Sequence, residues 1–386
     1  MGKDELLIIT VNYEIDRPHR IHHVVEFMAK HWNLTVLSRS YQSPDGVYQR
    51  GGIIEHQDKM EYIQVACAGH PFGFSIAQHA WEFIRTIRKL GRKFRVAVAG
   101  DPISGLAAAI LTREGLLGSF LYEDIDYFPG FYPEGAGRRI VEYAEAVSLE
   151  SATSIVCVSK LLAELRVEQG IQAERITILP NGAGVSKKYA AEDKSGIFTA
   201  AGLDGRDNLI AYFGILDESS GGELLLDLGR KLPGIGARLV VGGKGPLAGR
   251  FSQDPDIIFL GWVESRLLPS ILSRCKIGLI PFSGNPSTAQ YYACPLKLYD
   301  YTSCGLPVVA GNEGETARIV THHFLGIATS LQTGSFLHAV NRLLQDPVLY
   351  REHQNAAREF SRKHSWEQVL SREGDLVQEL FLRSGT

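Results

Sequence analysis

Short apolar runs alternate with longer amphipathic segments along the first half of the chain. The runs have the length of strands, and Ile155–Val158 is unbroken, as is typical of parallel strands buried on both faces. Alternation of this kind predicts a parallel sheet covered by helices. The expected strands are Leu6–Val11, Leu34–Ser38, Val96–Ala99, Ser119–Tyr122 and Ser154–Val158; the expected helices are Ile21–His31, Ile76–Leu90, Gly105–Arg113, Gly137–Ser151 and Lys160–Gln169.

A second alternating series begins near Leu209. Its expected strands are Leu209–Phe213, Ala237–Val241, Ile257–Leu260, Ile277–Pro281 and Pro307–Ala310; its expected helices are Gly222–Lys231, Glu264–Ser273, Leu296–Ser303 and Ser335–Leu344. Two series in tandem predict an α/β protein with two Rossmann-like domains. We expect the first domain to span residues 1–190, completed by a C-terminal helix at about 366–386, and the second to span 205–364. The polar, glycine-bearing stretch between Pro180 and Gly205 is the expected join.

Composition adds few constraints. The chain has 386 residues, of which 45% are apolar and 22% charged, and a net charge of −3, so bulk electrostatics do not favour a polyanion such as nucleic acid. Its five cysteines are scattered without a CxxC pair, which argues against a structural zinc site or a disulfide framework. The start of the chain lacks the apolar region of a signal peptide, and no run approaches the ~20 apolar residues that span a bilayer. We therefore expect a cytoplasmic protein.

The most informative segment runs from Pro295 to Val309 and reads as a helix followed by a Gly-x-Pro turn into a buried strand. Lys297 and Asp300 are three residues apart and therefore share a helix face. A lysine near a helix N-terminus can bind phosphate, and a carboxylate can accept hydrogen bonds from ribose hydroxyls. An exposed salt bridge would show the same spacing, so the pair alone does not decide between these interpretations.

Several strand ends in the second series carry glycine or aromatic residues. Gly214 closes the first strand, Lys244 lies in a glycine loop after the second, and Trp262 with Val263 follows the third. Ligands of open α/β sheets bind at the carboxyl ends of the strands. Together with the helix that begins after Pro295, these ends predict one nucleotide-binding crevice.

An acidic turn follows the strand Ser119–Tyr122 in the first half and contains Glu123, Asp124 and Asp126. Carboxylates at such a strand end can serve as a general base. A solvated acidic loop is the plain alternative. Asp124 and Asp126 also match the DxD motif of metal-dependent glycosyltransferases that have one Rossmann-like domain. That interpretation would leave Lys297 and the second domain without a role.

The order of these motifs resembles the two-domain glycosyltransferases called GT-B. The resemblance covers nearly the whole chain and is carried by Val156–Lys160 followed by Ile178–Gly182, and by the PxKxxD segment before Gly305-Leu306-Pro307. The large retaining group of that superfamily has two glutamates eight positions apart. Asp300 matches the second, whereas the first falls near Tyr292. The lysine variant is more similar to inverting, metal-independent enzymes of the xanthan type, which transfer glucuronate in bacterial exopolysaccharide synthesis.

The resemblance implies roles for particular residues. Lys297 would contact the diphosphate of a nucleotide sugar, Asp300 its ribose, and the backbone around Trp262 and Val263 its base. Asp126 would be the general base, with Asp124 as the neighbouring alternative. The remaining donor-site candidates are Gly214, Lys244 and Tyr299.

The loop after the first strand would lie under the reacting groups in this family. Asn12, Arg17 and Arg20 are therefore candidates for acceptor binding. A second candidate surface is the helix that ends at Leu90, because aromatic residues precede a basic run there, a composition that suits an anionic membrane. The run contains Arg85, Arg88, Lys89, Arg92, Lys93 and Arg95.

These observations predict a glycosyltransferase that uses a nucleotide sugar, expected to be UDP-linked, and a glycan or lipid-linked glycan acceptor of bacterial envelope synthesis. We expect inversion at the anomeric carbon, no metal and no other cofactor, and attachment to the inner membrane face. Two alternatives remain: a retaining transferase with the same donor site, and a nucleotide-sugar-binding scaffold protein without turnover.

Overall fold

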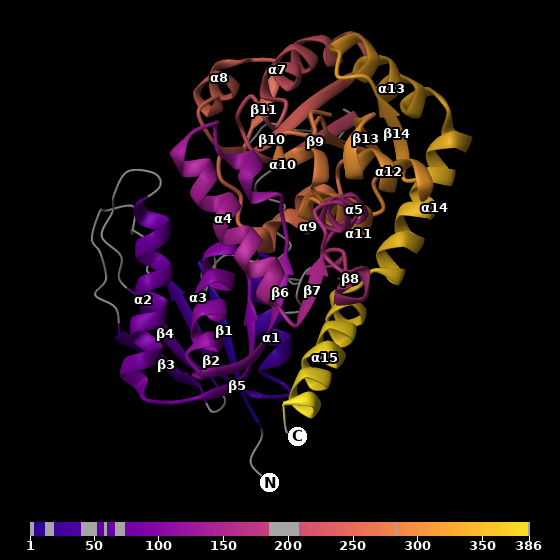
Figure 1. Ribbon diagram of the computed structural model, residues 1–386. Coiled ribbons are helices and arrows are strands. Elements are labelled where there is room, and N and C mark those ends of the chain that lie inside the picture. The colour runs from indigo at the N-terminus through magenta and orange to yellow at the C-terminus, as the bar shows by residue number, and fades with distance from the viewer. Residues whose placement is uncertain are drawn as a thin grey trace. The chain divides into compact units, whose positions relative to one another are not determined.

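The computed structural model describes residues 4–11, 19–39, 52–57, 60–65, 74–184, 208–282 and 284–384, with side chains described except at 52–57 and 74–76. The chain forms two compact units. Unit 1 contains Met1–Pro180 and Glu367–Thr386, and unit 2 contains Asn181–Trp366. Each unit is an α/β layer structure built on one sheet (Figure 1).

The sheet of unit 1 has the order β3-β4-β2-β1-β5-β6-β7-β8. All neighbouring pairs are parallel except β3 with β4. The central strands are fully buried because helices cover both faces, which explains their unbroken apolar runs. The strands are β1 (Glu5–Thr10), β2 (Asn33–Arg39), β3 (Gly52–Gln57), β4 (Met60–Val65), β5 (Phe94–Ala99), β6 (Leu117–Asp124), β7 (Ser154–Cys157) and β8 (Ile176–Ile178).

The helices of unit 1 connect these strands. They are α1 (Arg20–Met28), α2 (Phe74–Leu90), α3 (Pro102–Arg113), α4 (Ala136–Ser151) and α5 (Lys160–Glu168), with 3₁₀ turns η1 (Phe128–Phe131) and η2 (Ala173–Arg175). Asp101 caps α3 by accepting hydrogen bonds from the N–H groups of Ile103 and Ser104, and its other oxygen accepts one from the N–H of Val11 at 2.8 Å. One carboxylate thus ties the start of α3 to the end of β1. Among the described residues, no helix is both long enough and apolar enough to span a bilayer.

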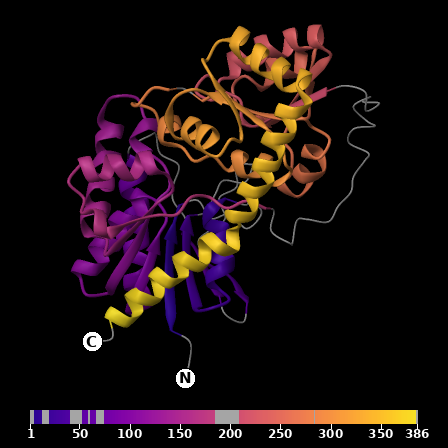
Figure 2. The ribbon, with the colours of Figure 1, turned by 90° about the vertical axis from the view of Figure 1, so that its right-hand side faces the viewer.

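The C-terminal helix α15 (Trp366–Arg383) packs along the sheet of unit 1 (Figure 2). Arg95 donates a 2.6 Å hydrogen bond to the carbonyl of Phe381, whose ring stacks on that of Trp32. Arg20 and Glu373 form a buried ion pair at 2.7 Å. Unit 1 is therefore completed by a segment more than 350 residues away from α1 in sequence.

The sheet of unit 2 has the order β11-β10-β9-β12-β13-β14 and is parallel throughout. Its strands are β9 (Asn208–Ile215), β10 (Ala237–Lys244), β11 (Ile257–Phe259), β12 (Ile277–Ile280), β13 (Val308–Gly311) and β14 (Gly326–Thr329). The order reverses between β9 and β12, and a ligand crevice is expected at such a point.

Helices cover this sheet as well. They are α7 (Gly222–Lys231), α8 (Ala248–Gln253), α9 (Leu268–Leu272), α10 (Ala289–Tyr292), α11 (Leu296–Ser303), α12 (Gly314–His322), α13 (Thr333–Gln345) and α14 (Pro347–Lys363), with 3₁₀ turns η4 (Leu232–Ile235) and η5 (Ser265–Leu267). The expected helix Glu264–Ser273 is divided into η5 and α9, because Pro269 has no N–H to donate and suits the first turn of a new helix.

The expected fold class, two parallel-sheet α/β domains, is confirmed. The sequence interpretation missed the strands β3, β4, β8 and β14 and the helices α8, α10, α12 and α14. The helix α14 shows the reason most clearly, since it buries only His353, Ala357 and Phe360 and so has a thin apolar stripe.

Candidate functional site

The helix α11 of unit 2 carries Lys297 and Asp300, and it packs beside β12 and β13. Pro295 precedes the first turn, so the helix begins where the sequence pattern placed it. The Lys297 ammonium nitrogen Nζ lies 4.1 Å from the centre of the Tyr212 ring and 5.0 Å from that of Phe282. Two ring faces thus hold the lysine cation at the carboxyl ends of β9 and β12.

Gly214 leaves the room that Lys297 occupies. Its φ is +154°, and a Cβ atom there would lie 2.6 Å from Lys297 Nζ. The neighbouring Gly243 has the same φ, and its Cβ would lie 1.8 Å from the carbonyl oxygen of Gly214. The two glycines therefore let β9 and β10 approach closely next to the lysine, which explains the glycines that the sequence places at both strand ends.

Burial shifts the titration of both charged groups on α11. It lowers the pKa of Lys297 to about 7, against the opposing charges of Asp217 and Asp300. Burial also raises the pKa of Asp300 to about 7, and the Lys297 charge acts in the other direction. Both side chains retain some solvent exposure. A half-buried lysine of this kind gains charge stabilisation when a phosphate replaces its lost water.

The other predicted donor residues fall into two groups. Lys244, at the end of β10, lies with Nζ 4.9 Å from the centre of the Trp262 ring, and that ring is 56% exposed. Val263 lies partly exposed next to Trp262. Tyr299, in contrast, is 1% exposed, and its hydroxyl lies 2.9 Å from Cys294 Sγ. Tyr299 is thus a core residue, whereas Lys244 and Trp262 offer a surface to a ligand.

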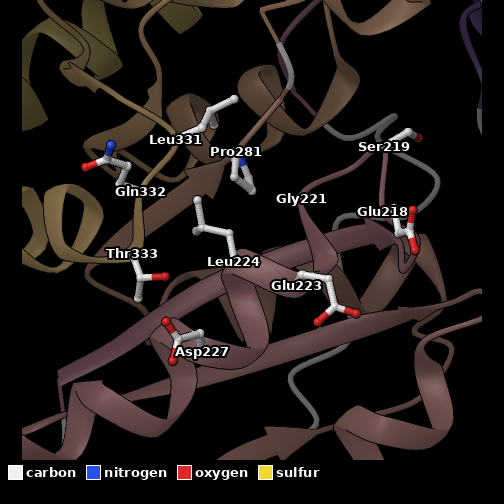
Figure 3. A pocket seen from close by; sticks show the side chains of 10 residues that line it. All are labelled: Glu218, Ser219, Gly221, Glu223, Leu224, Asp227, Pro281, Leu331, Gln332 and Thr333. Carbon is white, nitrogen blue, oxygen red and sulfur yellow. The ribbon is translucent and has the colours of Figure 1, made fainter.

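A pocket of about 660 Å³ lies in unit 2 between the first turns of α7 and α13 and Pro281 at the end of β12. Figure 3 shows Asp227 and Thr333 side by side at one end and Glu218 with Ser219 at the other. Its charged lining groups are Glu218, Glu223 and Asp227. Carboxylates repel a diphosphate, so a phosphate group should bind near Lys297 rather than among these three carboxylates.

Gln290 and Ser219, which the sequence interpretation missed, connect the loops around this pocket. Gln290 Nε2 donates a 2.9 Å hydrogen bond to Ser219 Oγ, and Asp217 accepts hydrogen bonds from the hydroxyl of Ser219 and the N–H of Ser220. The loop after β9 is thereby tied to α10. No spacing in the sequence indicates the contact between Gln290 and Ser219, because 71 residues separate the partners.

In unit 1, Asp126 follows the end of β6 and is partly buried. Burial and then the charge of Asp124 raise its pKa to about 7. A carboxylate that titrates near neutrality can both take up and release a proton at the working pH of a typical enzyme. This property distinguishes Asp126 from an ordinary solvated acidic loop.

Asp124 and Glu123 have other partners. Asp124 is fully buried and accepts two hydrogen bonds from Arg166, at 2.7 and 2.9 Å. Glu123 is fully buried and accepts one from Arg20 at 2.6 Å. Both carboxylates are thus engaged by arginines in the interior, where an acceptor hydroxyl has no access, and we interpret them as structural.

Arg20 has the same structural character. Its guanidinium is 4% exposed and binds Glu123, Glu373 and the carbonyls of Leu179 and Pro180. Such a group has no donor directed to solvent for an acceptor, so we withdraw Arg20 from acceptor binding. The predicted residues Asn12 and Arg17 lie outside the described residues.

Within the described ranges, no group of three or more His, Cys, Asp or Glu side chains is arranged to hold a metal ion. The arginines of the predicted basic run pair with carboxylates. The pairs are Arg85 with Glu82, Arg88 with Glu114, Arg92 with Glu5 and Glu61, and Arg95 with Asp4.

Two protein-family models match the chain, one in each unit. The model described as Glycosyl transferase 4-like domain matches residues 19–182, and the model described as Glycosyl transferases group 1 matches residues 207–346. A chitobiosyldiphosphodolichol beta-mannosyltransferase from Candida albicans is 26% identical over 147 residues, which cover 34% of this chain and 31% of the relative's length.

Solved structures resemble the whole chain. Sucrose-phosphate synthase from Thermosynechococcus elongatus has a TM-score of 0.77 at 18% identity, covering 99% of this chain and 100% of its own. HepE from Anabaena in complex with UDP and glucose has a TM-score of 0.71 at 14% identity, covering 97% and 100%. WaaG, a glycosyltransferase of lipopolysaccharide biosynthesis, has a TM-score of 0.70 at 14% identity, covering 96% and 99%. At these identities the likeness establishes the fold alone.

Proposed function

The chain belongs to the group 1 glycosyltransferases with the GT-B fold, and from this premise we propose that it transfers a sugar from UDP to a hydroxyl of a glycan or lipid-linked glycan, with inversion at the anomeric carbon. Unit 2 binds the donor. Unit 1 binds the acceptor and supplies the base.

The arrangement around Lys297 carries the donor half of this proposal. Its ammonium lies against the rings of Tyr212 and Phe282, next to the side-chain-free surface of Gly214. The diphosphate binds there, and the ammonium neutralises the negative charge that develops on the departing UDP. Asp300, one helical turn away, accepts a hydrogen bond from a ribose hydroxyl. Lys244 and Trp262 border the same strand ends and contact the nucleotide.

Asp126 carries the acceptor half. Its carboxylate accepts the proton of the acceptor hydroxyl while the acceptor oxygen forms a bond to the anomeric carbon. The bond from that carbon to the diphosphate oxygen breaks at the same time, and the electron pair leaves with UDP. The raised pKa of Asp126, about 7, suits a general base that must take up a proton at neutral pH.

The charged groups of unit 2 support a reaction without a metal. Lys297, with Lys244 and backbone N–H groups, takes the role that a divalent cation has in other transferases. The choice of UDP is supported by the UDP, glucose and UDP-glucose complexes of HepE, which shares the fold. Glucuronate, glucose, galactose and hexosamines are the candidate sugars.

We place the reaction at the inner face of a bacterial cell membrane, in envelope or exopolysaccharide synthesis. The fold similarity to WaaG is consistent with this role. Because the arginines near α2 are paired with carboxylates, attachment would depend on Trp81, which is 53% exposed, and on the exposed Lys89 and Lys93.

The test of the proposed function is the variant Asp126→Asn. Asparagine has the same shape but cannot accept the proton, so transfer should fall by at least about 100-fold, while the Kd for UDP-glucose stays at the wild-type value. Radiolabel transfer from UDP-sugars to membrane lipid extracts measures activity, with EDTA present to exclude a metal contribution. Glu134→Gln, an exposed carboxylate near the same turn, is the matched control. Wild-type transfer by Asp126→Asn would remove the base from the mechanism.

Product stereochemistry separates this proposal from a retaining transferase. NMR of the isolated product gives the anomeric configuration directly. Inversion supports Asp126 as base, whereas retention favours the alternative in which Asp300 keeps its ribose role and no base is needed. UDP-glucose binding with no turnover on any acceptor would favour a scaffold protein.

A further inference from the structure

The turn that carries Asp126 is held by a buried group of charges. It begins at the end of β6, where Asp124 is buried, and it ends in η1, which starts at Phe128. Arg166, on α5, is fully buried although it is one of the largest side chains in the protein. Burial of an arginine without close partners is costly, so its partners define its role.

Arg166 contacts the start of the turn directly, and through Glu145 it is joined to α4, which packs against η1 at the end of the turn. Its Nε and Nη2 atoms donate to the two oxygens of Asp124 at 2.7 and 2.9 Å, which is a bidentate pair. Its Nη1 donates to Glu145 on α4 at 2.8 Å. Arg166 Nη2 also lies 2.8 Å from the other Glu145 oxygen, and α4, which carries Glu145, packs against η1.

The residue between Asp126 and Phe128 is fixed by the same elements. The guanidinium carbon of Arg166 lies 6.0 Å from the centre of the Tyr127 ring. The hydroxyl of Tyr127 accepts a 3.2 Å hydrogen bond from Arg138 on α4. Arg166 thus contacts residues on both sides of Asp126, namely Asp124 and Tyr127.

We propose that Arg166, acting with Asp124 and Glu145, is a positioning residue that fixes the turn carrying Asp126, so that the carboxylate keeps one orientation toward the acceptor hydroxyl. The inference rests on the proposed role of Asp126 as base. It assigns no chemistry to Arg166 itself, because its donors bind Asp124, Glu145 and Gln169.

Stability alone does not account for this arrangement. Replacing a buried ion pair by apolar residues of similar volume is often neutral or stabilising. An ion pair has a directional geometry that apolar packing lacks, and a bidentate pair fixes a carboxylate in its plane. The strict placement of a base within hydrogen-bond reach of its substrate needs such geometry.

The test is the variant Glu145→Gln, assayed in the full-length protein. Glutamine removes the negative charge that faces Arg166, and its NH2 group donates where a carboxylate oxygen faced the guanidinium. The kcat should fall by about 10- to 100-fold, the range expected when a reacting group is misplaced by a fraction of an ångström to one ångström. The Kd for UDP-glucose should stay unchanged, since unit 2 binds it. Arg166→Lys, which keeps the charge but loses the fork, should behave likewise.

The pH profile gives a readout that a merely structural role would not move. Burial and the Asp124 charge keep the pKa of Asp126 near 7. The charged groups around the turn are Asp124 on β6, Arg166 on α5, and Glu145 and Arg138 on α4. If the turn loosens and Asp126 gains water, the acidic limb of kcat/KM should move to lower pH in Glu145→Gln.

The matched control is Glu373→Gln. Glu373 also pairs with a buried arginine of unit 1, Arg20. Arg20 in turn binds Glu123, whose side chain points to the opposite face of β6 from that of Asp124. This variant should lose no activity, and its melting temperature shows the effect of losing one buried carboxylate. Wild-type kcat and an unmoved acidic limb in Glu145→Gln overturn the positioning role. If that result accompanies an inactive Asp126→Asn, only this inference fails; if Asp126→Asn is active, the proposed base fails and the inference fails with it.

Discussion

Lys297 is the side chain on which the proposed donor site depends most. Aromatic rings favour its charged form through their negative faces, but burial opposes the charge more strongly and lowers the pKa to about 7. In the free protein at neutral pH, the lysine is therefore close to half protonated. A bound diphosphate interacts with the protonated form, so donor binding and proton uptake are linked.

Donor affinity should consequently fall as the pH rises above about 7. Below that pH the ammonium is already present, and above it each binding event must first add a proton, which weakens binding by at most about tenfold per pH unit. Asp300 loses its proton in the same pH range, and its negative charge then repels the diphosphate, which also weakens donor binding. Calorimetric titration with UDP-glucose from pH 6 to 9, in buffers of different ionisation enthalpy, measures both the Kd and the proton uptake.

Lys297→Arg is the control for this prediction. A guanidinium stays charged across the whole range, so the Kd of this variant should be independent of pH, even if its absolute affinity is lower. A wild-type Kd that does not change between pH 6 and 9 would contradict the link between Lys297 and the diphosphate.

At the residue scale, the sequence revealed local spacing and missed distant partners. Lys297 and Asp300 could be placed on one helix face because three residues separate them. Asp124 could not be assigned to Arg166, 42 residues away, nor Arg20 to Glu373, 353 residues away. Asp124 was a candidate because it follows a strand, and Arg20 because it follows the loop after the first strand. Position alone does not show that each has a buried partner distant in sequence.

At the scale of elements, α15 shows how one helix closes a domain. Arg20 lies between Glu123 and Glu373, and it also binds the carbonyls of Leu179 and Pro180, where the chain leaves unit 1. In the described structure, Glu123 Oε2 and Glu373 Oε1 have no hydrogen-bond donor. A proton on Glu373 allows it to donate to Glu123, which satisfies both oxygens and leaves one negative charge opposite the arginine.

Because of the pair Glu123 and Glu373, the free energy of unfolding should fall as the pH rises. Burial and then the Glu123 charge raise the pKa of Glu373 from 4.5 to about 8. Between these values the folded protein holds a proton that the unfolded chain has lost. The free energy of unfolding thus decreases as pH rises from about 5 to about 8, by at most about 1.4 kcal/mol per pH unit.

Urea unfolding of the wild type and Glu373→Gln across that pH range measures this effect. Glutamine cannot titrate, so the slope against pH should be smaller in the variant. Glu379→Gln on the same helix is the control, because Glu379 is 56% exposed and pairs with Arg383 at the surface. Equal slopes in all three proteins would show that Glu373 is ionised in the folded state.

Elements could be predicted where an apolar pattern was strong. The buried central strands of both sheets and the amphipathic helices α4 and α7 lie within a few residues of their expected bounds. β14 was missed because its four residues, Gly326–Thr329, include a glycine and are only partly buried. β3 pairs with a neighbour on one side only, and such an edge strand needs no continuous apolar run.

At the scale of the whole molecule, the two units differ in how their chains are assembled. Unit 2 is one continuous segment, Asn181–Trp366, with its own six-stranded sheet and core. Unit 1 is discontinuous, because Glu367–Thr386 returns to it after unit 2 is complete. The residues proposed to bind the donor therefore lie in a continuous segment, whereas the proposed base lies in the discontinuous unit 1.

This difference predicts the behaviour of fragments. Residues 181–366 should fold alone and bind UDP-glucose with a Kd within about threefold of the full chain, or about 0.7 kcal/mol, because Lys297, Asp300 and Lys244 and their contacts all lie inside the fragment. Calorimetry on the purified fragment measures this, and Lys297→Met in the fragment is the matched control. A folded fragment that does not bind UDP-glucose would place essential donor contacts in unit 1.

Residues 1–180, in contrast, should not fold without the C-terminal segment. Without α15, Arg20 lacks its partner Glu373, and the surface of Trp32 that Phe381 covers becomes exposed. Breaking one side of a buried ion pair costs about 3–5 kcal/mol, a large part of the stability of a typical domain. A peptide of residues 367–386 added to the fragment should restore cooperative unfolding followed by circular dichroism. The peptide with Glu373→Lys, which places a second cation beside Arg20, should not, so the difference between the two peptides isolates the Arg20 contact from the rest of the helix.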